Sequence, residues 1–412
     1  MAAIAGLRGT GDWATDERPK SFREYIMWRM PNGDTPITAL TSKISKEVVS
    51  DPEFNWWDEP ADILRLQVNG ALVAADTTVV VDSTDPDTTT PNAVWGTALH
   101  LVPGDILMVE PAADAAPFAP EYIRVTQVIS ATTFKVERGV GGGAAAGNIG
   151  NDVYLLKVGS AFAEGSAAPA SATRNPIKYT NYCQIFKTTY ELTNTALVTT
   201  TRTGDPLAND KKRKMFDHAR DIEFAIMFGK KYETTGSNGK PLRYTAGIRA
   251  QIPTATTTVF GAAVTISSFL DAVYPVFDYS TPGGDTRIAF CGNKALNKLN
   301  KIIQSDTNTS IQFNSQIKFY GMTFQEFILP QGRILLRTHP LLNRHSLYND
   351  SMWLIDFSAL RWRYTKGRDG VFKDNIQGND EDTRKGQWLT EGGLEVRYGG
   401  LSCGYLGYIS HA

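Results

Sequence analysis

The sequence has few of the residues that build disulfide scaffolds or zinc sites. Its 412 residues include only three cysteines, Cys183, Cys291 and Cys403, and five histidines. An odd, widely spaced set of cysteines without a CxxC pair is typical of a reducing compartment, not of a secreted disulfide framework. The histidines form no HExxH pair and none lies near a cysteine cluster, so we expect neither a bound metal nor a cofactor.

The chain also lacks an excess of charge of one sign. There are 42 Lys and Arg residues against 43 Asp and Glu residues, which gives a formal net charge of -1. A protein whose main task is a sequence-independent grip on DNA carries a clear basic excess, so that class is excluded.

Long apolar runs are missing as well. No run approaches the roughly 18 to 20 residues that a membrane span requires. The apolar residues 1–7 follow no basic region and are soon interrupted by Arg8 and Asp12, which argues against a signal peptide. We expect a soluble protein made in a cytoplasm.

The length allows two or three domains at roughly 150 residues each. Residues 1 to about 60 predict an extended arm, because Gly, Pro, Asp and Thr interrupt every apolar patch; its one possible helix is Ser21 to Met30. The arm ends in an aromatic strand that places Phe54 and Trp56 on one face. Such a face requires a packing partner.

Short strand-like runs with turn residues between them follow, from about residue 61 to 162. Phe134 and Val136 alternate with Lys135 and Glu137, so one face of that run is buried and the other is wet. The runs are 74–81, 106–110, 122–129, 133–138 and 153–158. This pattern predicts a small all-β module inserted into a larger chain.

The longest predicted helix runs from Leu207 to Phe228, after Asp205 as N-cap and Pro206 at the first position, and ends at Gly229. Its apolar stripe is Ala208, Met215, Ala219, Ile222 and Ile226; its charged face carries Lys211, Lys212, Arg213 and Lys214 with Asp217, Asp221 and Glu223. We interpret the basic run as a solvated helix face with charges paired four residues apart, with DNA contact as the alternative.

The remaining segments mix both kinds of structure. Residues 177–192 predict a strand antiparallel to the one at Trp56 and Trp57, making a long hairpin that carries the β module. Helices are expected near 267–277 and after Asn293, with a strand at 287–290, and mostly strands in 311–341, 352–364 and 394–409. The fold class is therefore α+β and not doubly wound.

Motifs for catalysis and ligand binding are incomplete. Gly400, Ser402 and Gly404 fit the nucleophile elbow of serine hydrolases, but no acidic residue follows Ser402, and only His411 could act as base. Residues 236–240 are interpreted as a plain turn and not as a phosphate-binding loop. Asp82, Asp85 and Asp87 lack the central glycine and the bidentate glutamate of a calcium loop. We expect no enzyme; a hydrolase using Ser402 stays open as the distant alternative.

An ordered series of short segments carries a family resemblance. The segments are Thr35–Leu40, Phe54–Glu59, Leu101–Asp105, Val136–Gly142, Gly159–Gly165, Asn181–Phe186 and Gly247–Arg249. In this order they resemble the major capsid proteins of tailed bacteriophages, whose shell fold is named after the phage Hong Kong ninety-seven. More narrowly, they resemble the major head proteins that carry an inserted β domain before the long helix.

The resemblance implies a role for each part of the chain. The expected parts are an N-terminal arm (1–50), an extended hairpin loop (51–66 and 166–203), an inserted β domain (67–165), a peripheral domain with the long spine helix (204–259), an axial domain (260–390) and C-terminal strands that return to the peripheral domain (391–412). The expected contacts between subunits involve Phe54, Trp56, Trp57, Ile185, Phe186, Lys211 and Arg213.

The implied function is assembly without turnover. Pentamers and hexamers would close into an icosahedral shell in the host cytoplasm, enclosing double-stranded DNA without sequence-specific binding and becoming part of the virion. Because the arm begins without a charged helical leader, a separate scaffolding protein is implied unless processing has removed such a leader, and portal and decoration proteins are further partners. A decoration protein or another virion protein is the alternative.

Overall fold

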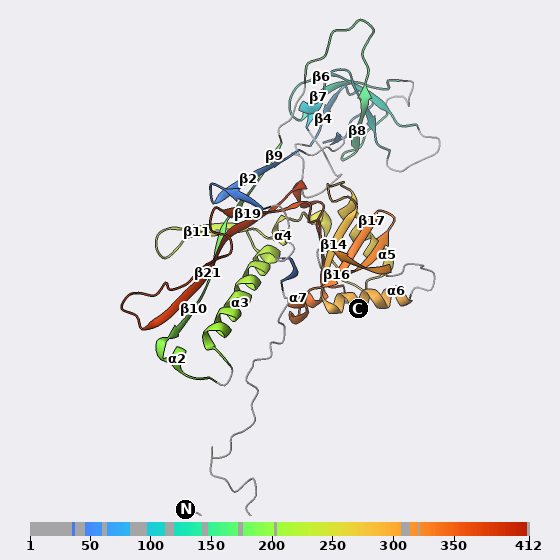
Figure 1. The fold of residues 1–412 in the computed structure, drawn as a ribbon. Helices are drawn as coiled ribbons and strands as arrows, with labels where there is room; N and C mark the ends of the chain where they lie inside the picture. The colour runs from blue at the N-terminus through green and yellow to red at the C-terminus, as the bar shows by residue number, and fades with distance from the viewer. Residues whose placement is uncertain are drawn as a thin grey trace, which may run out of the picture.

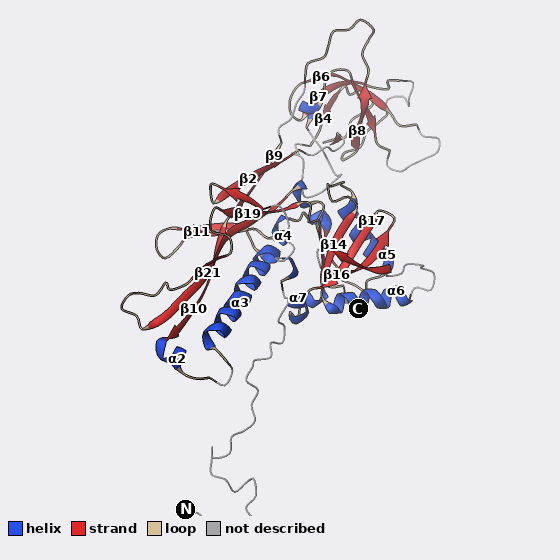
Figure 2. Ribbon diagram, viewed as in Figure 1, coloured by secondary structure: helices blue, strands red, loops and turns tan. Residues whose placement is uncertain are grey.

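The computed structural model describes residues 35–37, 46–59, 64–82, 97–111, 119–141, 147–171, 176–201, 204–305, 314–319 and 322–409. Helices and strands are mixed throughout these ranges, which confirms the predicted α+β class (Figure 2). Of the helices in the described ranges, none is both long and apolar enough to cross a membrane. The predicted helix at 21–30 lies outside the described residues.

Six antiparallel strands that lie between residues 65 and 160 form a sheet that closes into a barrel. The strands in spatial order are β3 (Arg65–Gln67), β8 (Tyr154–Ser160), β5 (Asp105–Val109), β6 (Tyr122–Val128), β7 (Thr133–Glu137) and β4 (Thr78–Val80). The two outer strands meet, because the Asn69 amide donates to the Val80 carbonyl at 2.9 Å and the Asp82 amide to Gln67 at 3.0 Å. Closure leaves the barrel without a free sheet edge.

The barrel has its own hydrophobic core. Phe134 and Val136 point into it while Lys135 and Glu137 are exposed, as the alternation predicted. Inside lie fourteen buried residues, among them Leu107, Ile123 and Leu155. The barrel occupies one end of the molecule, beyond the strands β2 and β9 (Figure 1).

Strands β2 (Glu53–Asp58) and β9 (Ile177–Tyr182) form a two-stranded antiparallel ribbon in which Trp56 faces Tyr179. The predicted hairpin partner is confirmed for this part of the chain. The prediction is wrong beyond Cys183, because β10 (Gln184–Thr193) leaves the ribbon and pairs over ten residues with β21 (Thr383–Val396). A partner about 200 residues away thus replaces the local one.

The sheet built on β21 lies beside the longest helix, α3 (Pro206–Phe228) (Figure 1). Its other strands are β19 (Leu360–Thr365), β20 (Val371–Lys373) and β1 (Lys46–Val49), the last parallel to β19. The short helix α2 (Asn194–Val198) follows β10.

The ends of α3 follow the predicted signals. The Asp205 carboxylate accepts from the Leu207 amide at 2.9 Å, and Pro206 occupies the first turn. At Gly229 a Cβ atom would lie 2.4 Å from the Thr245 carbonyl oxygen, so only glycine fits where the helix ends.

The faces of α3 differ from the prediction. Ala208 and Met215 of the predicted apolar stripe are exposed, whereas Ile222 and Ile226 are buried as expected. Glu223, predicted on the solvated face, is fully buried. The reason is that only the C-terminal half of α3 enters the core, where side chains distant in sequence surround it.

A seven-stranded sheet forms the other half of the body, covered by α5 (Ile266–Val273) and α6 (Asn293–Ser305). Its order is β13 (Thr257–Val259), β22 (Gly404–Gly407), β18 (Met352–Ile355), β14 (Thr286–Cys291), β17 (Gly332–Thr338), β16 (Met322–Leu329) and β15 (Asn314–Phe319). The helices predicted near 267–277 and after Asn293, and the strand at 287–290, are confirmed.

The C-terminal strands, which were predicted to return together to the peripheral domain, lie in two different sheets. The end of β21 pairs with β19 beside α3, whereas β22 pairs with β13 and β18 of the seven-stranded sheet. The body also contains two short helices, α4 (Ile248–Gln251) and α7 (Pro340–Arg344), and the hairpin of β11 (Tyr232–Thr235) and β12 (Pro241–Tyr244).

Candidate subunit-contact surfaces

The ribbon of β2 and β9 separates the predicted aromatic contacts into two groups. Phe54 and Trp56 are buried beside Cys183, and the Trp56 ring stacks on Tyr179 with centroids 5.8 Å apart. Trp57 points the other way and is 60% exposed, with the Lys178 ammonium 5.8 Å from its ring. Within the ribbon, therefore, Trp57 is exposed to solvent, and Phe54 and Trp56 belong to the interior of the subunit.

The predicted pair on β10 divides in the same way. Phe186 packs in the main core with Ile222 and Trp362, while Ile185 is half-exposed. Neighbouring residues of a strand point to opposite faces. Since the face that carries Phe186 packs on the core, only the face that carries Ile185 is exposed. Ile185 is the member of the pair available to another chain.

Lys211 and Arg213 are bound to acidic partners within the subunit. The Lys211 ammonium lies 3.1 Å from the Asp374 carboxylate and 5.2 Å from the centroid of the Phe372 ring. Asp374 also accepts from the Tyr190 hydroxyl at 2.6 Å and from Arg384 at 3.0 Å. The hydrogen bond from Tyr190 lowers the pKa of Asp374 most, and the hydrogen bonds from Arg384 and Lys211 lower it further. Arg213 pairs with Asp210 at 3.2 Å.

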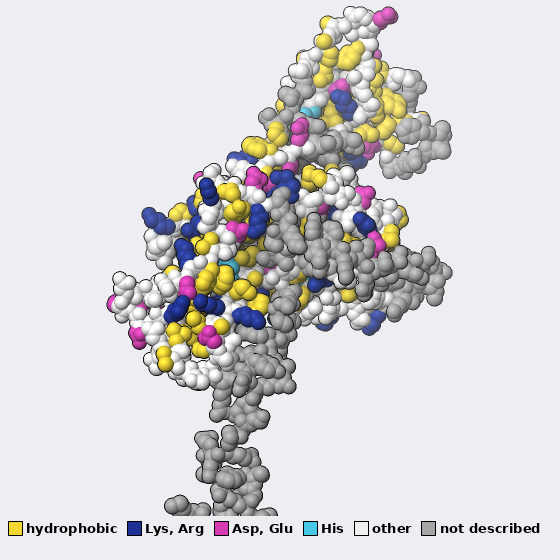
Figure 3. Space-filling view, in the orientation of Figure 1, with side chains coloured by type: hydrophobic (Ala, Val, Ile, Leu, Met, Phe, Trp, Pro, Cys, Tyr) yellow, Lys and Arg dark blue, Asp and Glu magenta, His cyan; other side chains and the backbone are white. Residues whose placement is uncertain are grey.

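The paired charges support the interpretation of the basic run as a solvated helix face, although the spacing is three residues and not four. Lys214 lies 3.9 Å from Asp217, which also pairs with Arg220 at 2.6 Å. On the face seen in Figure 3, Lys and Arg side chains lie among acidic and apolar ones and form no single basic patch. An arrangement of compensated charges gives little attraction to DNA.

A buried polar cluster that no local sequence pattern indicates fixes the segment 35–37 to the body. The Ile37 amide donates to the Glu223 carboxylate at 2.9 Å, and His339 Nε2 lies 2.8 Å from the same oxygen. His339 Nδ1 accepts from the Leu341 amide at 3.3 Å, so Nε2 carries the hydrogen donated to Glu223. Ile37, Glu223 and His339 are fully buried. The three partners are far apart in sequence.

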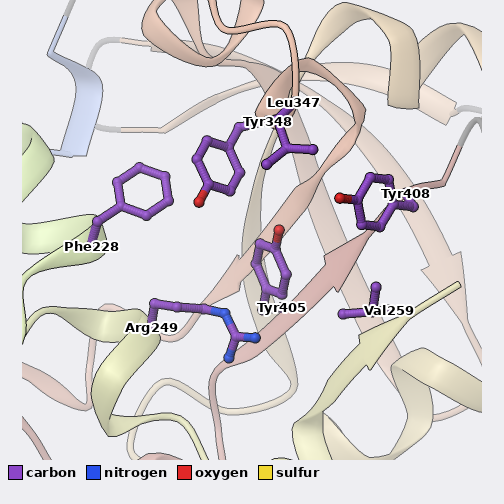
Figure 4. A pocket seen from close by; sticks show the side chains of 7 residues that line it. All are labelled: Phe228, Arg249, Val259, Leu347, Tyr348, Tyr405 and Tyr408. Carbon is purple, nitrogen blue, oxygen red and sulfur yellow. The ribbon is translucent and has the colours of Figure 1, made fainter.

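One surface pocket of about 200 Å³ lies where the end of α3 meets β13 and β22 (Figure 4). Its lining residues are Phe228, Arg249, Val259, Leu347, Tyr348, Tyr405 and Tyr408. The hydroxyls of Tyr348, Tyr405 and Tyr408 point toward its middle. The Arg249 guanidinium lies 4.4 Å from the Tyr405 ring centroid and donates to Thr257 at 3.3 Å.

The serine and the cysteines considered for chemistry are buried in the described part of the chain. Ser402 is fully buried, so no substrate reaches its hydroxyl. All three cysteines are free and buried, and burial raises the pKa of each thiol to about 12. In the described ranges no three His, Cys, Asp or Glu side chains gather as metal ligands. Asp85 and Asp87 lie outside those ranges.

Sequence reasoning missed several exposed apolar residues, including Tyr232, Leu242 and Tyr244 on the hairpin of β11 and β12. The loop between these strands was interpreted as a plain turn, and it is a hairpin loop. The alternation of Tyr232, Thr234, Leu242 and Tyr244 was the available signal. It shows which residues share a face but not that this face points to solvent.

Comparisons with known proteins extend over nearly the whole chain. The sequence model of a family described as SU10 major capsid protein matches residues 15–405. A major capsid protein of Pseudomonas phage PaMx41 is 26% identical over 393 residues, which cover 93% of this chain and 87% of that protein.

Solved structures are more distant. The capsid of a native GTA particle aligns over 96% of both chains with 9% identity and a TM-score of 0.45. A structure of Mycobacterium phage Adephagia covers 92% of this chain and 89% of that chain, with 9% identity and a TM-score of 0.41.

Proposed function

This chain belongs to the SU10 major capsid protein family, and we propose that many copies of it close in the host cytoplasm into an icosahedral shell around the double-stranded DNA of a phage. The observation that carries this proposal is the family match over residues 15–405, which includes α3, both large sheets and the ribbon. The family match also agrees with the resemblance to tailed-phage major capsid proteins that the order of the short sequence segments carries.

The surface is suited to repeated contacts with copies of the same chain. Trp57, Ile185 and Tyr232 present apolar area to solvent on separate elements. Contacts of this kind are weak individually and numerous in a closed assembly. The net charge of -1 avoids the mutual repulsion that strongly charged subunits would have at close packing.

We assign the parts of the chain as the resemblance implies, with boundaries adjusted to the strands. The arm (1–50), the extended loop (51–66 and 166–203) and the inserted domain (67–165) precede α3. The proposed peripheral domain combines α3 with the sheet of β10, β19 and β21. The proposed axial domain is the seven-stranded sheet with α5 and α6, and it includes β22.

We propose that the barrel braces neighbouring subunits, because the ribbon that carries it belongs to the loop expected to overlap an adjacent copy. Binding of host-surface sugars or of a decoration protein is the competing role. Replacing residues 68–160 by a short Gly-Ser linker separates the two. Bracing predicts shells that form but melt at lower temperature; unchanged melting of the shells would remove this role.

The test of the shell itself is negative-stain electron microscopy of the purified protein, expressed with its neighbouring viral genes so that the proposed scaffolding and portal partners are present. Closed shells tens of nanometres across are expected. Small uniform rings or trimers, formed although a scaffold is present, would contradict the proposal and favour a decoration protein.

A further inference from the structure

The hairpin of β11 and β12 has an apolar face that its own subunit leaves uncovered. The two strands pair with each other and form a separate two-stranded sheet. Tyr232 lies opposite Tyr244, with ring centroids 6.0 Å apart, and Leu242 lies opposite Thr234 on the same face. Tyr232, Leu242 and Tyr244 are 60%, 45% and 40% exposed.

The other face of the hairpin is charged and is turned toward the ribbon. Glu233 and Arg243 lie opposite each other and pair at 2.8 Å. Lys231 donates to the Thr180 hydroxyl, and its ammonium lies 4.9 Å from the ring centroid of Tyr182 in β9. An antiparallel strand pair normally packs its apolar face on the body and its charged face in solvent. Here the arrangement is inverted.

A two-stranded hairpin is marginally stable in water, and packing of an apolar face is what usually stabilises it. An exposed aromatic cluster on such an element marks an interaction surface, and tyrosine is enriched where proteins bind proteins. The inverted orientation therefore indicates that a second molecule completes the packing of the hairpin.

The charges identify the kind of surface that fits. Of the four basic residues in 230–244, Lys231 and Arg243 lie on the charged face, and Lys230 and Lys240 are exposed and available to a neighbouring molecule. The loop 376–382 between β20 and β21, called the acidic loop below, contains Asp380, Glu381 and Asp382 and no basic residue. These three acidic residues are exposed, and Ile376 adds a partly exposed apolar side chain. In Figure 1 the hairpin and the acidic loop project from the same margin of the molecule.

We propose that the Tyr232, Leu242 and Tyr244 face of one copy packs against the acidic loop of a neighbouring copy, with Lys240 beside Asp380. This inference rests on the proposed function, because it takes the neighbour to be a second copy of this chain. Copies arranged around a rotation axis near the shared margin bring the hairpin of one to the acidic loop of the next. The opposite charges select this register against others.

A charge exchange tests the pairing. Lys240→Glu and Asp380→Lys each place like charges together, and each is expected to lower the shell yield about tenfold at low salt. The chain with both substitutions restores opposite charges and should recover most of the wild-type yield. A double variant that assembles no better than the single variants overturns the proposal, as do single variants with wild-type yield.

The aromatic face has its own test. Tyr232→Thr with Tyr244→Thr keeps residues that favour strands but removes the apolar face. The matched control is Tyr274→Thr, which alters an exposed tyrosine on another element. Equal melting temperatures of the free subunits show that folding is intact. The hairpin variant should lose shells while the control keeps them, and equal shell yield in the two overturns the proposal.

Failure of this inference is distinguishable from failure of the proposed function. If the wild-type protein forms no closed shells with its neighbouring genes present, the proposed function fails. Shells from the wild type that persist unchanged in every hairpin and loop variant leave that function standing and reject the contact.

Discussion

The barrel and the two-stranded elements use antiparallel strands in opposite ways. In the barrel each of six strands has neighbours on both sides, the outer strands join through Asn69 and Asp82, and the apolar side chains point inward. The ribbon of β2 and β9 and the hairpin of β11 and β12 have two strands each and expose Trp57 and Tyr232. A closed sheet completes its packing alone, whereas an open strand pair with an exposed apolar face leaves packing to a partner.

This difference separates stability from assembly within one chain. Substitutions inside the barrel should change the free energy of unfolding of the subunit. Substitutions on the outer faces of the ribbon and hairpin should change the yield of shells. A barrel substitution that changed only the yield of shells, or an outer-face substitution that changed only subunit stability, would contradict this separation.

The largest expected effect is at the centre of the barrel. Phe134→Ala removes a fully buried ring and should destabilise the barrel by about 3–5 kcal/mol through lost burial and the cavity left behind. Hydrogen exchange of the β6 and β7 amides measures this change. Lys135→Ala, one residue further on the outer face, is the control and should change stability by less than about 0.5 kcal/mol.

A buried ion pair of the barrel comes next. Arg138 and Glu121 pair at 2.6 Å with side chains only 5% and 8% exposed. Arg138→Met leaves the carboxylate buried without its partner and should cost about 3 kcal/mol. Similar amide exchange rates in this variant and the wild type would show that the pair contributes little.

The same pair predicts a pH dependence. Desolvation alone would raise the pKa of Glu121, but the Arg138 hydrogen bond and the Gly147 amide outweigh it and lower the pKa. Because the folded pKa is below the unfolded value of about 4.3, the ionised carboxylate stabilises the barrel above that pH, and the stabilisation is lost as pH falls. Acid titration of barrel stability should show this loss in the wild type and not in Glu121→Gln.

Adjacent tryptophans of the ribbon should separate the two effects. Trp56→Ala removes a buried ring and should destabilise the subunit by about 3 kcal/mol. Trp57→Ala should change subunit stability by less than about 0.5 kcal/mol but lower the yield of shells. Thermal melting of free subunits and particle counting by electron microscopy measure the two quantities. A stable Trp56→Ala subunit, or normal shells from Trp57→Ala, would contradict the assignment of the faces.

The smallest effect is expected on the outside of the barrel. Arg124 and Glu137 pair at 2.6 Å, but their side chains are 44% and 50% exposed. Exposed pairs are screened by water and salt, so Arg124→Gln should change stability by at most about 1 kcal/mol. A loss comparable to that of Arg138→Met would show that burial does not decide the strength of these pairs.

Local signals predicted the elements of this fold well. Asp205 and Pro206 marked the start of α3, and the alternation around Phe134 marked a strand and its buried face. Both depend on residues within a few positions of each other. The pairing of β10 with β21 could not be predicted in this way, because the partners are about 200 residues apart. The closure of the barrel joins nearer residues, Val68 and Val81, but alternation within one run does not say which other run it pairs with.

The contact residues show the same limit. Alternation put Phe54 and Trp56 on the face opposite Trp57, but it does not say which face the subunit covers itself. Glu223 was placed with the charged residues of α3, since nothing nearby indicates its contacts with Ile37 and His339. In the hairpin, no local pattern indicates that Lys231 lies against Tyr182, the contact that turns the apolar face outward.

Hydrogen exchange, measured segment by segment in free subunits and in closed shells, tests directly whether neighbouring copies cover the open strand pairs. Amides of residues 230–244 and 53–58 should exchange about tenfold or more slowly in shells than in free subunits, because neighbours then cover the open strand pairs. Amides of β5, β6 and β7, already paired on both sides, should exchange at the same rate in both states. Equal exchange of residues 230–244 in free subunits and shells would contradict the claim that a neighbouring copy completes the hairpin.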